Sequence, residues 1–73
     1  MEKLRRNEFK DLLEINELLF QEFEYFIKAD IPKLGKVTYY TKKNRLNINK
    51  ENKWIDEGFN FIKNHLSNDK HNI

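Results

Sequence analysis

The chain has 73 residues, no cysteine and a formal net charge of +2. A chain this short forms one domain near the lower limit of independent stability, and without cysteine neither disulfides nor a thiolate-bound zinc ion can reinforce it. No apolar run has the length of a signal-peptide core or a membrane span, so we expect a cytoplasmic protein without membrane association. We predict a single domain over residues 1–73, with frayed ends at 1–6 and 67–73.

Residues 7–28 carry apolar side chains at spacings of three and four, which predicts one long amphipathic helix. The opposite side of this helix would be acidic, with Glu14, Glu17 and Glu24 on it. Regularly spaced carboxylates can imitate a phosphate backbone, so this face is a candidate partner-binding surface. A charged outer face is also ordinary for a helix in water. Leu18, at the edge of the apolar stripe, is a candidate contact of a homodimer. The apolar positions are Phe9, Leu12, Leu13, Leu19, Phe20, Phe23, Phe26 and Ile27.

Charge is segregated along the chain. Residues 7–27 hold six acids and one lysine, whereas residues 28–53 hold eight bases and two acids. This pattern predicts an acidic and a basic pole on the folded molecule.

A β-hairpin is expected after a connector at residues 30–35, where Pro32 disfavours helix and Gly35 supplies a flexible position. Residues 36–40 and 45–48 alternate apolar and polar side chains around a four-residue turn. If Tyr40 pairs with Arg45, one register separates the two faces of the hairpin. The expected buried face contains Val37, Tyr39, Leu46 and Ile48, and the expected open face contains Thr38, Tyr40, Arg45 and Asn47.

The basic hairpin is the strongest candidate for chemistry. Tyr40 could stack on an unpaired base while Lys42, Lys43 and Arg45 contact phosphates, so these four residues are a candidate partner-binding or nucleic-acid-binding site. The alternative is a solvated hairpin whose lysines keep a sheet edge soluble.

A second turn is expected at residues 49–52, followed by a helix from Glu57 to about Leu66 with Asp56 as its N-cap. A start at Asn52 is the alternative. Ile55, Phe59, Ile62 and Leu66 would form the core stripe of this helix. The expected fold class is α+β: a long N-terminal helix, a β-hairpin or small antiparallel sheet, and a C-terminal helix.

Three aromatic residues, Tyr25, Trp54 and Phe61, are hard to place in one small core and are contact candidates. The alternative is that so small a domain needs every aromatic for packing. The chain has one serine, Ser67, and its two histidines are six positions apart. We therefore expect no enzymatic activity, no cofactor and no metal site.

The segment YYTKKNRLNI at residues 39–48, followed by KWIDEGF at 53–59, resembles a pattern in small proteins of phages and mobile elements. The resemblance implies a small inhibitor of host machinery, such as an anti-CRISPR protein. The leading hypothesis is thus a phage-type protein that binds a host protein or protein–nucleic-acid complex. The alternatives are a nucleic-acid-binding accessory protein and an assembly subunit that dimerises through its first helix.

Overall fold

The computed structural model describes residues 2–71, and the side chains of residues 3–68, as two helices and a five-stranded sheet. The expected α+β class is confirmed, and the alternative of a small antiparallel sheet holds: the sheet has five strands, of which the predicted hairpin supplies two. In chain order the elements are α1 (Glu2–Ile15), β1 (Phe20–Glu22), β2 (Phe26–Ile31), β3 (Gly35–Tyr40), β4 (Arg45–Ile48), β5 (Lys53–Asp56) and α2 (Gly58–His71).

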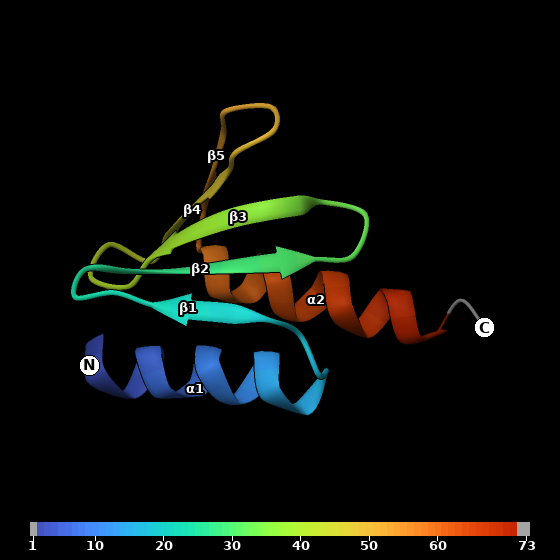
Figure 1. The fold of residues 1–73 in the computed structure, drawn as a ribbon, viewed down its shortest axis with the longest axis horizontal. Coiled ribbons are helices and arrows are strands. Elements are labelled where there is room, and N and C mark those ends of the chain that lie inside the picture. Colours follow the sequence, from blue (N-terminus) through green and yellow to red (C-terminus); the bar gives the residue numbers. More distant parts are fainter. Residues whose placement is uncertain (1, 72–73) are drawn as a thin grey trace.

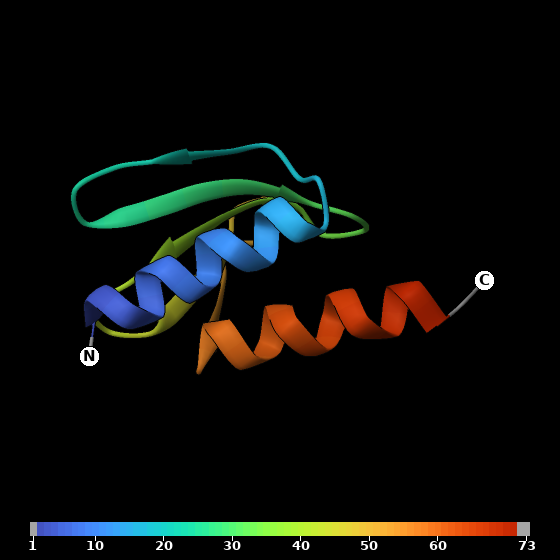
Figure 2. The ribbon, with the colours of Figure 1, turned by 90° about the horizontal axis from the view of Figure 1, so that it is seen from below.

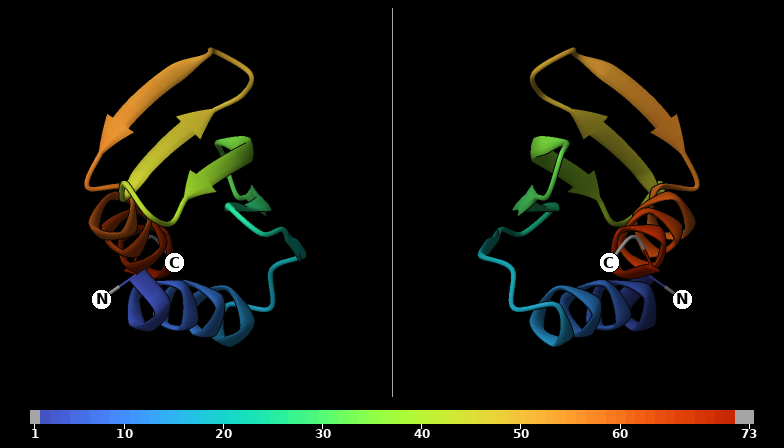
Figure 3. Two further views of the ribbon diagram at one scale, coloured as in Figure 1. Left: turned by 90° about the vertical axis from the view of Figure 1, so that its left-hand side faces the viewer. Right: turned by 90° about the vertical axis from the view of Figure 1, so that its right-hand side faces the viewer.

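The five strands form an antiparallel meander in which each strand pairs with the next one along the chain. Both helices lie on the same side of this sheet (Figure 1) and next to each other (Figure 2). We call the face that the helices cover the inner face and the opposite one the outer face. The sheet curls, so that the hairpin of β4 and β5 rises away from the helices (Figure 3).

The core lies between the inner face and the two helices. Phe9 of α1 stacks on Tyr39 of β3 with ring centroids 4.2 Å apart, which joins the two layers at the centre. From α2, Ile62 and Leu66 pack into the same cluster and Phe59 packs against it, whereas Ile55, the other member of the predicted helix stripe, belongs to β5. The other buried members are Leu13, Ile27, Ala29, Ile31, Val37, Leu46 and Ile48.

The predicted hairpin is confirmed in its register. Tyr40 pairs with Arg45, Tyr39 with Leu46 and Val37 with Ile48. The expected buried face is buried, because alternation with a period of two leaves only one register that hides all four apolar side chains. The connector before it is a tight turn, in which the Leu34 N–H donates to the Ile31 carbonyl at 3.0 Å.

The predicted helix over residues 7–28 is wrong beyond Ile15. The Leu18 N–H donates to the Leu13 carbonyl at 2.9 Å and the Glu17 N–H donates to the Glu14 carbonyl at 3.0 Å, with Glu17 at a φ of 57°. These two bonds and the left-handed residue form a Schellman motif, which ends a helix. Residues 20–22 and 26–31 are strands instead. The connector predicted at residues 30–35 therefore joins two strands, β2 and β3, rather than a helix and a strand.

The N-cap predicted for the C-terminal helix is also wrong. Residues 53–56 form strand β5, and α2 begins at Gly58. The side-chain oxygen of Asn44, in the turn between β3 and β4, accepts the Phe59 N–H at 3.2 Å, and the Asn44 carbonyl accepts the Gly58 N–H at 2.9 Å. The cap of α2 therefore comes from a residue far away in the sequence.

The chain ends differ from the expected fraying. Residues 2–6 belong to α1 and residues 67–71 belong to α2, while residues 1, 72 and 73 lie outside the described part. Within residues 2–71, neither helix combines the length and apolar character that a bilayer crossing requires.

Candidate functional site

One hollow of about 390 Å³ gathers most of the residues that the sequence singled out. Of the seven hairpin and aromatic candidates, all except Phe61 line it. They come from four different parts of the sheet: the turn between β1 and β2, the end of β3 with the following turn, β4, and β5. We call it the basic–aromatic hollow, lined by Tyr25, Tyr40, Lys42, Lys43, Arg45 and Trp54.

The rings in this hollow are close and accessible. Tyr40 and Trp54 have ring centroids 5.4 Å apart, although β4 runs between their strands. Trp54 is 46% exposed and Tyr25 is 70% exposed, which is unusual for large aromatic side chains in a domain this small. The exposed ring surface is therefore available to a ligand and is not used in packing the core.

Arg45 adds fixed positive charge beside the rings. Its guanidinium lies 4.9 Å from the centroid of the Trp54 ring, within cation–π range, and its Nε is 3.0 Å from the Asp56 carboxylate. Both contacts hold the guanidinium across the edge of the sheet. Lys42 and Lys43 are exposed in the adjacent turn.

Two further aromatic residues extend the ring surface along the outer face. Phe23 stacks on Phe26 at 4.8 Å, and Phe26 lies 5.8 Å from Tyr40. We call the series Phe23, Phe26, Tyr40 and Trp54 the aromatic row. The sequence prediction placed Phe23 and Phe26 in a helix core. The alternation of Ile27, Ala29 and Ile31 could have indicated instead that residue 26 faces the other way.

Arg6 holds the turn that carries Tyr25. Its guanidinium donates to the Phe23 carbonyl at 2.7 Å, to the Glu24 carbonyl and to the Thr41 hydroxyl at 3.0 Å. The turn between β1 and β2 is thereby tied to the turn between β3 and β4. The sequence prediction missed this role because Arg6 falls in the segment expected to fray, and its partners are remote in sequence.

The three acidic candidates do not share a surface. Glu14 lies in α1, Glu17 lies just after it, and Glu24 lies in the turn between β1 and β2. Because β1 runs back along α1, that turn is near the N-terminal end of α1, at the other end of the molecule from Glu17 (Figure 1). The predicted acidic helix face is therefore wrong, because α1 ends at Ile15, before Glu17 and Glu24.

Phe61 stands apart from the other aromatic candidates. It is partly buried against the core and stacks on His65 of the same helix at 6.4 Å. The His65 Nε2 is 2.7 Å from the Pro32 carbonyl, which ties α2 to the turn between β2 and β3. Among the described side chains, no three His, Cys, Asp or Glu residues are grouped to hold a metal ion.

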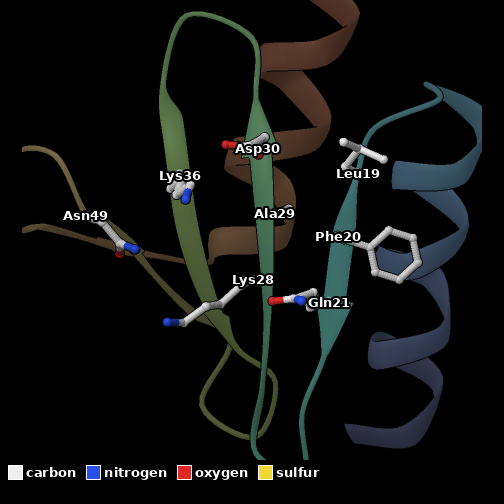
Figure 4. A pocket seen from close by; sticks show the side chains of 8 residues that line it. All are labelled: Leu19, Phe20, Gln21, Lys28, Ala29, Asp30, Lys36 and Asn49. Atoms are coloured by element: carbon white, nitrogen blue, oxygen red, sulfur yellow. The ribbon is translucent and has the colours of Figure 1, made fainter.

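A second hollow, of about 520 Å³, opens over β1, β2 and β3. Figure 4 shows Lys28 and Lys36 on adjacent strands, with Asp30 and Gln21 beside them. We call it the lysine hollow, lined by Leu19, Phe20, Gln21, Lys28, Ala29, Asp30, Lys36 and Asn49. Lys28 also faces the aromatic row, because its Nζ lies 5.9 Å from the centroid of the Phe26 ring.

Polar side chains fill the middle of the outer face. Thr38 and Asn47 lie on this face, as predicted, but they are only 5% and 8% exposed. The Thr38 hydroxyl donates to Asn49 Oδ1 at 3.2 Å, and the Asn47 amide donates to Asn52 Oδ1 at 3.2 Å. Residues of the turn between β4 and β5 therefore cover positions that the sequence prediction left open.

Comparison of this chain with protein-family models, curated proteins and solved structures found no match. The resemblance to phage and mobile-element proteins, and the inhibitor function that it implies, stay predictions.

Proposed function

We propose that the protein binds single-stranded nucleic acid through the basic–aromatic hollow. The observation that carries the proposal is the convergence of two exposed rings, the partly buried ring of Tyr40 and three cationic side chains from separate strands and turns in one hollow. Aromatic faces stack on unpaired bases, and the ammonium and guanidinium groups attract the phosphates between them. The proposal includes a cytoplasmic location, which the absence of cysteine supports.

The geometry favours a single strand over a duplex. Stacking on Tyr40 or Trp54 requires a base that is already unpaired, because a base pair inside a duplex offers its edges and not its faces. Tyr40 lies 5.4 Å from Trp54 and 5.8 Å from Phe26, so a strand that lies on the outer face at Tyr40 meets a continuous aromatic surface.

The two lysines of the turn add charge where the rings are exposed. Lys42 and Lys43 lie in the turn that follows Tyr40, and Arg45 begins the next strand. Two arginines of α1 fix the position of this turn. Arg5 donates to the Lys42 carbonyl at 3.5 Å, and Arg6 donates to the Thr41 hydroxyl. A positioned turn loses less conformational freedom when it binds a ligand.

Trp54 supplies a direct test, because it is the one tryptophan in the chain. We expect a single-stranded oligonucleotide to quench its fluorescence and an equal concentration of duplex to quench it far less. Tyr40→Ala should weaken binding of the single strand by about 5- to 150-fold, the range expected for the loss of one stacked base.

The charge contribution is tested with a matched pair of variants. Lys43→Glu should weaken binding and lower the salt dependence of the affinity, whereas Lys63→Glu, an exposed change on α2 of the opposite layer, should not. Unchanged Trp54 fluorescence at saturating oligonucleotide, or equal effects of the two lysine variants, would contradict the proposal.

A further inference from the structure

The outer face carries a second set of phosphate-binding groups next to the aromatic row. The lysine hollow has the ammonium groups of Lys28 and Lys36 and the side-chain amides of Gln21 and Asn49, and Asp30 is its one acidic side chain. Lysine binds phosphate as a point charge, and amide N–H groups are common phosphate donors.

We propose that the lysine hollow is a phosphate subsite for the same nucleic-acid strand, occupied by nucleotides beyond those that stack in the basic–aromatic hollow. This inference rests on the proposed function. It adds the path of the strand, which would run along β2 and β3 on the outer face, from the end that carries Phe26 and Tyr40 to the end that carries Asp30 and Lys36.

Lys28 provides the continuity between the two hollows. It lines the lysine hollow, while its Nζ lies 5.9 Å from the Phe26 ring centroid at the middle of the aromatic row. A phosphate of a strand that continues past Tyr40 and Phe26 would therefore meet Lys28 first. Lys36, on the neighbouring strand, would meet the phosphate that follows (Figure 4).

The dimensions of the sheet agree with such a path. Tyr40 and Lys36 are four positions apart on β3, a distance of about 13 Å at about 3.3 Å per residue. At about 3.4 Å per phosphate along a stacked strand, this distance is about four nucleotides, so a strand of about four nucleotides in the basic–aromatic hollow stops short of Lys36 and a longer one reaches it.

Asp30 makes the inference sharper. Asp30 of β2 lies opposite Lys36 of β3 in the strand register, and it lines the lysine hollow. Its carboxylate would therefore repel a phosphate there. Loss of this charge should strengthen binding, whereas loss of the Lys36 charge should weaken it. A merely structural role of these exposed side chains would not produce opposite effects.

The test compares two oligothymidylates, one of about four and one of about twelve nucleotides, by Trp54 quenching. Lys36→Gln should weaken binding of the longer strand by about threefold or more at moderate salt and leave the shorter one unchanged. Asp30→Asn should tighten binding of the longer strand alone. Lys63→Gln is the charge-matched control, and circular dichroism confirms that each variant folds.

The outcomes separate this inference from the function on which it rests. If neither strand quenches Trp54, the proposed function fails and the subsite fails with it. If both strands bind but Lys36→Gln and Asp30→Asn leave the longer one unchanged, the subsite is overturned and the function stands. Equal weakening of both lengths by Lys36→Gln would also overturn it, since Lys36 would then belong to the primary site.

Discussion

Asn44 joins β3 and α2 through one side chain. Its Oδ1 accepts the Tyr39 hydroxyl at 2.7 Å and the Phe59 N–H at 3.2 Å, and its backbone has a φ of 54°, which asparagine tolerates better than most residues. Burial raises the pKa of Tyr39 to about 12, so its hydroxyl keeps the proton that it donates to Asn44. The turn of the hairpin therefore also starts the last helix.

Replacement of Asn44 should show how much this junction contributes. Asn44→Ala removes the acceptor of a buried hydroxyl and the N-cap of α2, so we expect the free energy of unfolding to fall by about 2 kcal/mol. Asn44→Asp keeps the oxygen and should retain most of the stability. Urea denaturation measures both, and equal stability of Asn44→Ala and the parent would contradict the assigned role.

Glu17 explains why the end of α1 is hard to see in the sequence. Its φ of 57° belongs to the left-handed region, in which glycine is the usual residue after a helix. A glutamate there carries a conformational cost and gives no stop signal. The residue that could have indicated the helix end is its neighbour Asn16, whose side-chain amide donates to the Leu12 carbonyl at 2.8 Å in the last turn of α1.

Glycine at position 17 should therefore stabilise the protein. We expect Glu17→Gly to raise the free energy of unfolding by about 0.5–1 kcal/mol, because glycine adopts this conformation without a Cβ clash. The same change three positions earlier, Glu14→Gly, should lower it by about 1 kcal/mol, because Glu14 is helical. Thermal unfolding of the two variants would refute the interpretation if their shifts had the same sign.

Among the elements, β1 and β2 show the largest difference between the sequence prediction and the structure. The apolar side chains between Phe20 and Ile27 recur at helical spacing, yet Ile27, Ala29 and Ile31 also alternate, so local pattern alone allows either structure. The edge of β3 decides between them, because residues 26–31 pair with it along their whole length. The hairpin of β3 and β4, by contrast, needs only its own turn and alternation.

A charge cluster attaches β1 to α1. The Glu22 carboxylate lies 3.1 Å from both the Lys10 ammonium and the Arg6 guanidinium. Hydrogen bonds from Lys10 and Arg6 hold the pKa of Glu22 below its usual value of 4.5. The folded state therefore favours the ionised carboxylate, and this contribution is present above the unfolded pKa.

Acid should remove the contribution of Glu22 to stability. As the pH falls below 4.5 and through the lowered folded pKa, the carboxylate becomes protonated in both states and the preference disappears. Glu22→Gln should be less stable than the parent at neutral pH and equal to it near the acid end of the titration. Glu51→Gln, an exposed change in the turn between β4 and β5, should show no such convergence.

At the scale of the molecule, the expected poles are only partly separate. Exposed acids such as Glu8 and Asp11 lie on α1 in the helical layer, while Lys28, Lys36 and Arg45 lie on the outer face of the sheet. Glu22, however, pairs with the bases Arg6 and Lys10. The helical layer is therefore not the acidic pole that the sequence predicted, because α1 also carries Lys3, Arg5, Arg6 and Lys10.

One core should make the whole molecule unfold in a single step. Leu46 and Ile48 of β4 pack into the same cluster as Phe9 of α1 and Ile62 of α2. Trp54 fluorescence reports the outer hairpin and far-ultraviolet circular dichroism reports the helices, so we expect the two urea transitions to coincide. An earlier transition of Trp54 would mean that β5 opens as a separate unit.

The sequence alone determined the hairpin register and the core positions Phe59, Ile62 and Leu66 of α2, because alternation, turn length and helical spacing are local properties. The tertiary structure decided that residues 20–22 and 26–31 are strands, that Asn44 caps α2, and that Tyr25 and Trp54 line one hollow with Tyr40. Each of these depends on a partner remote in sequence, whether a strand edge with unpaired hydrogen-bonding groups or a helix end in need of an acceptor. A local pattern carries no information about which remote group arrives there.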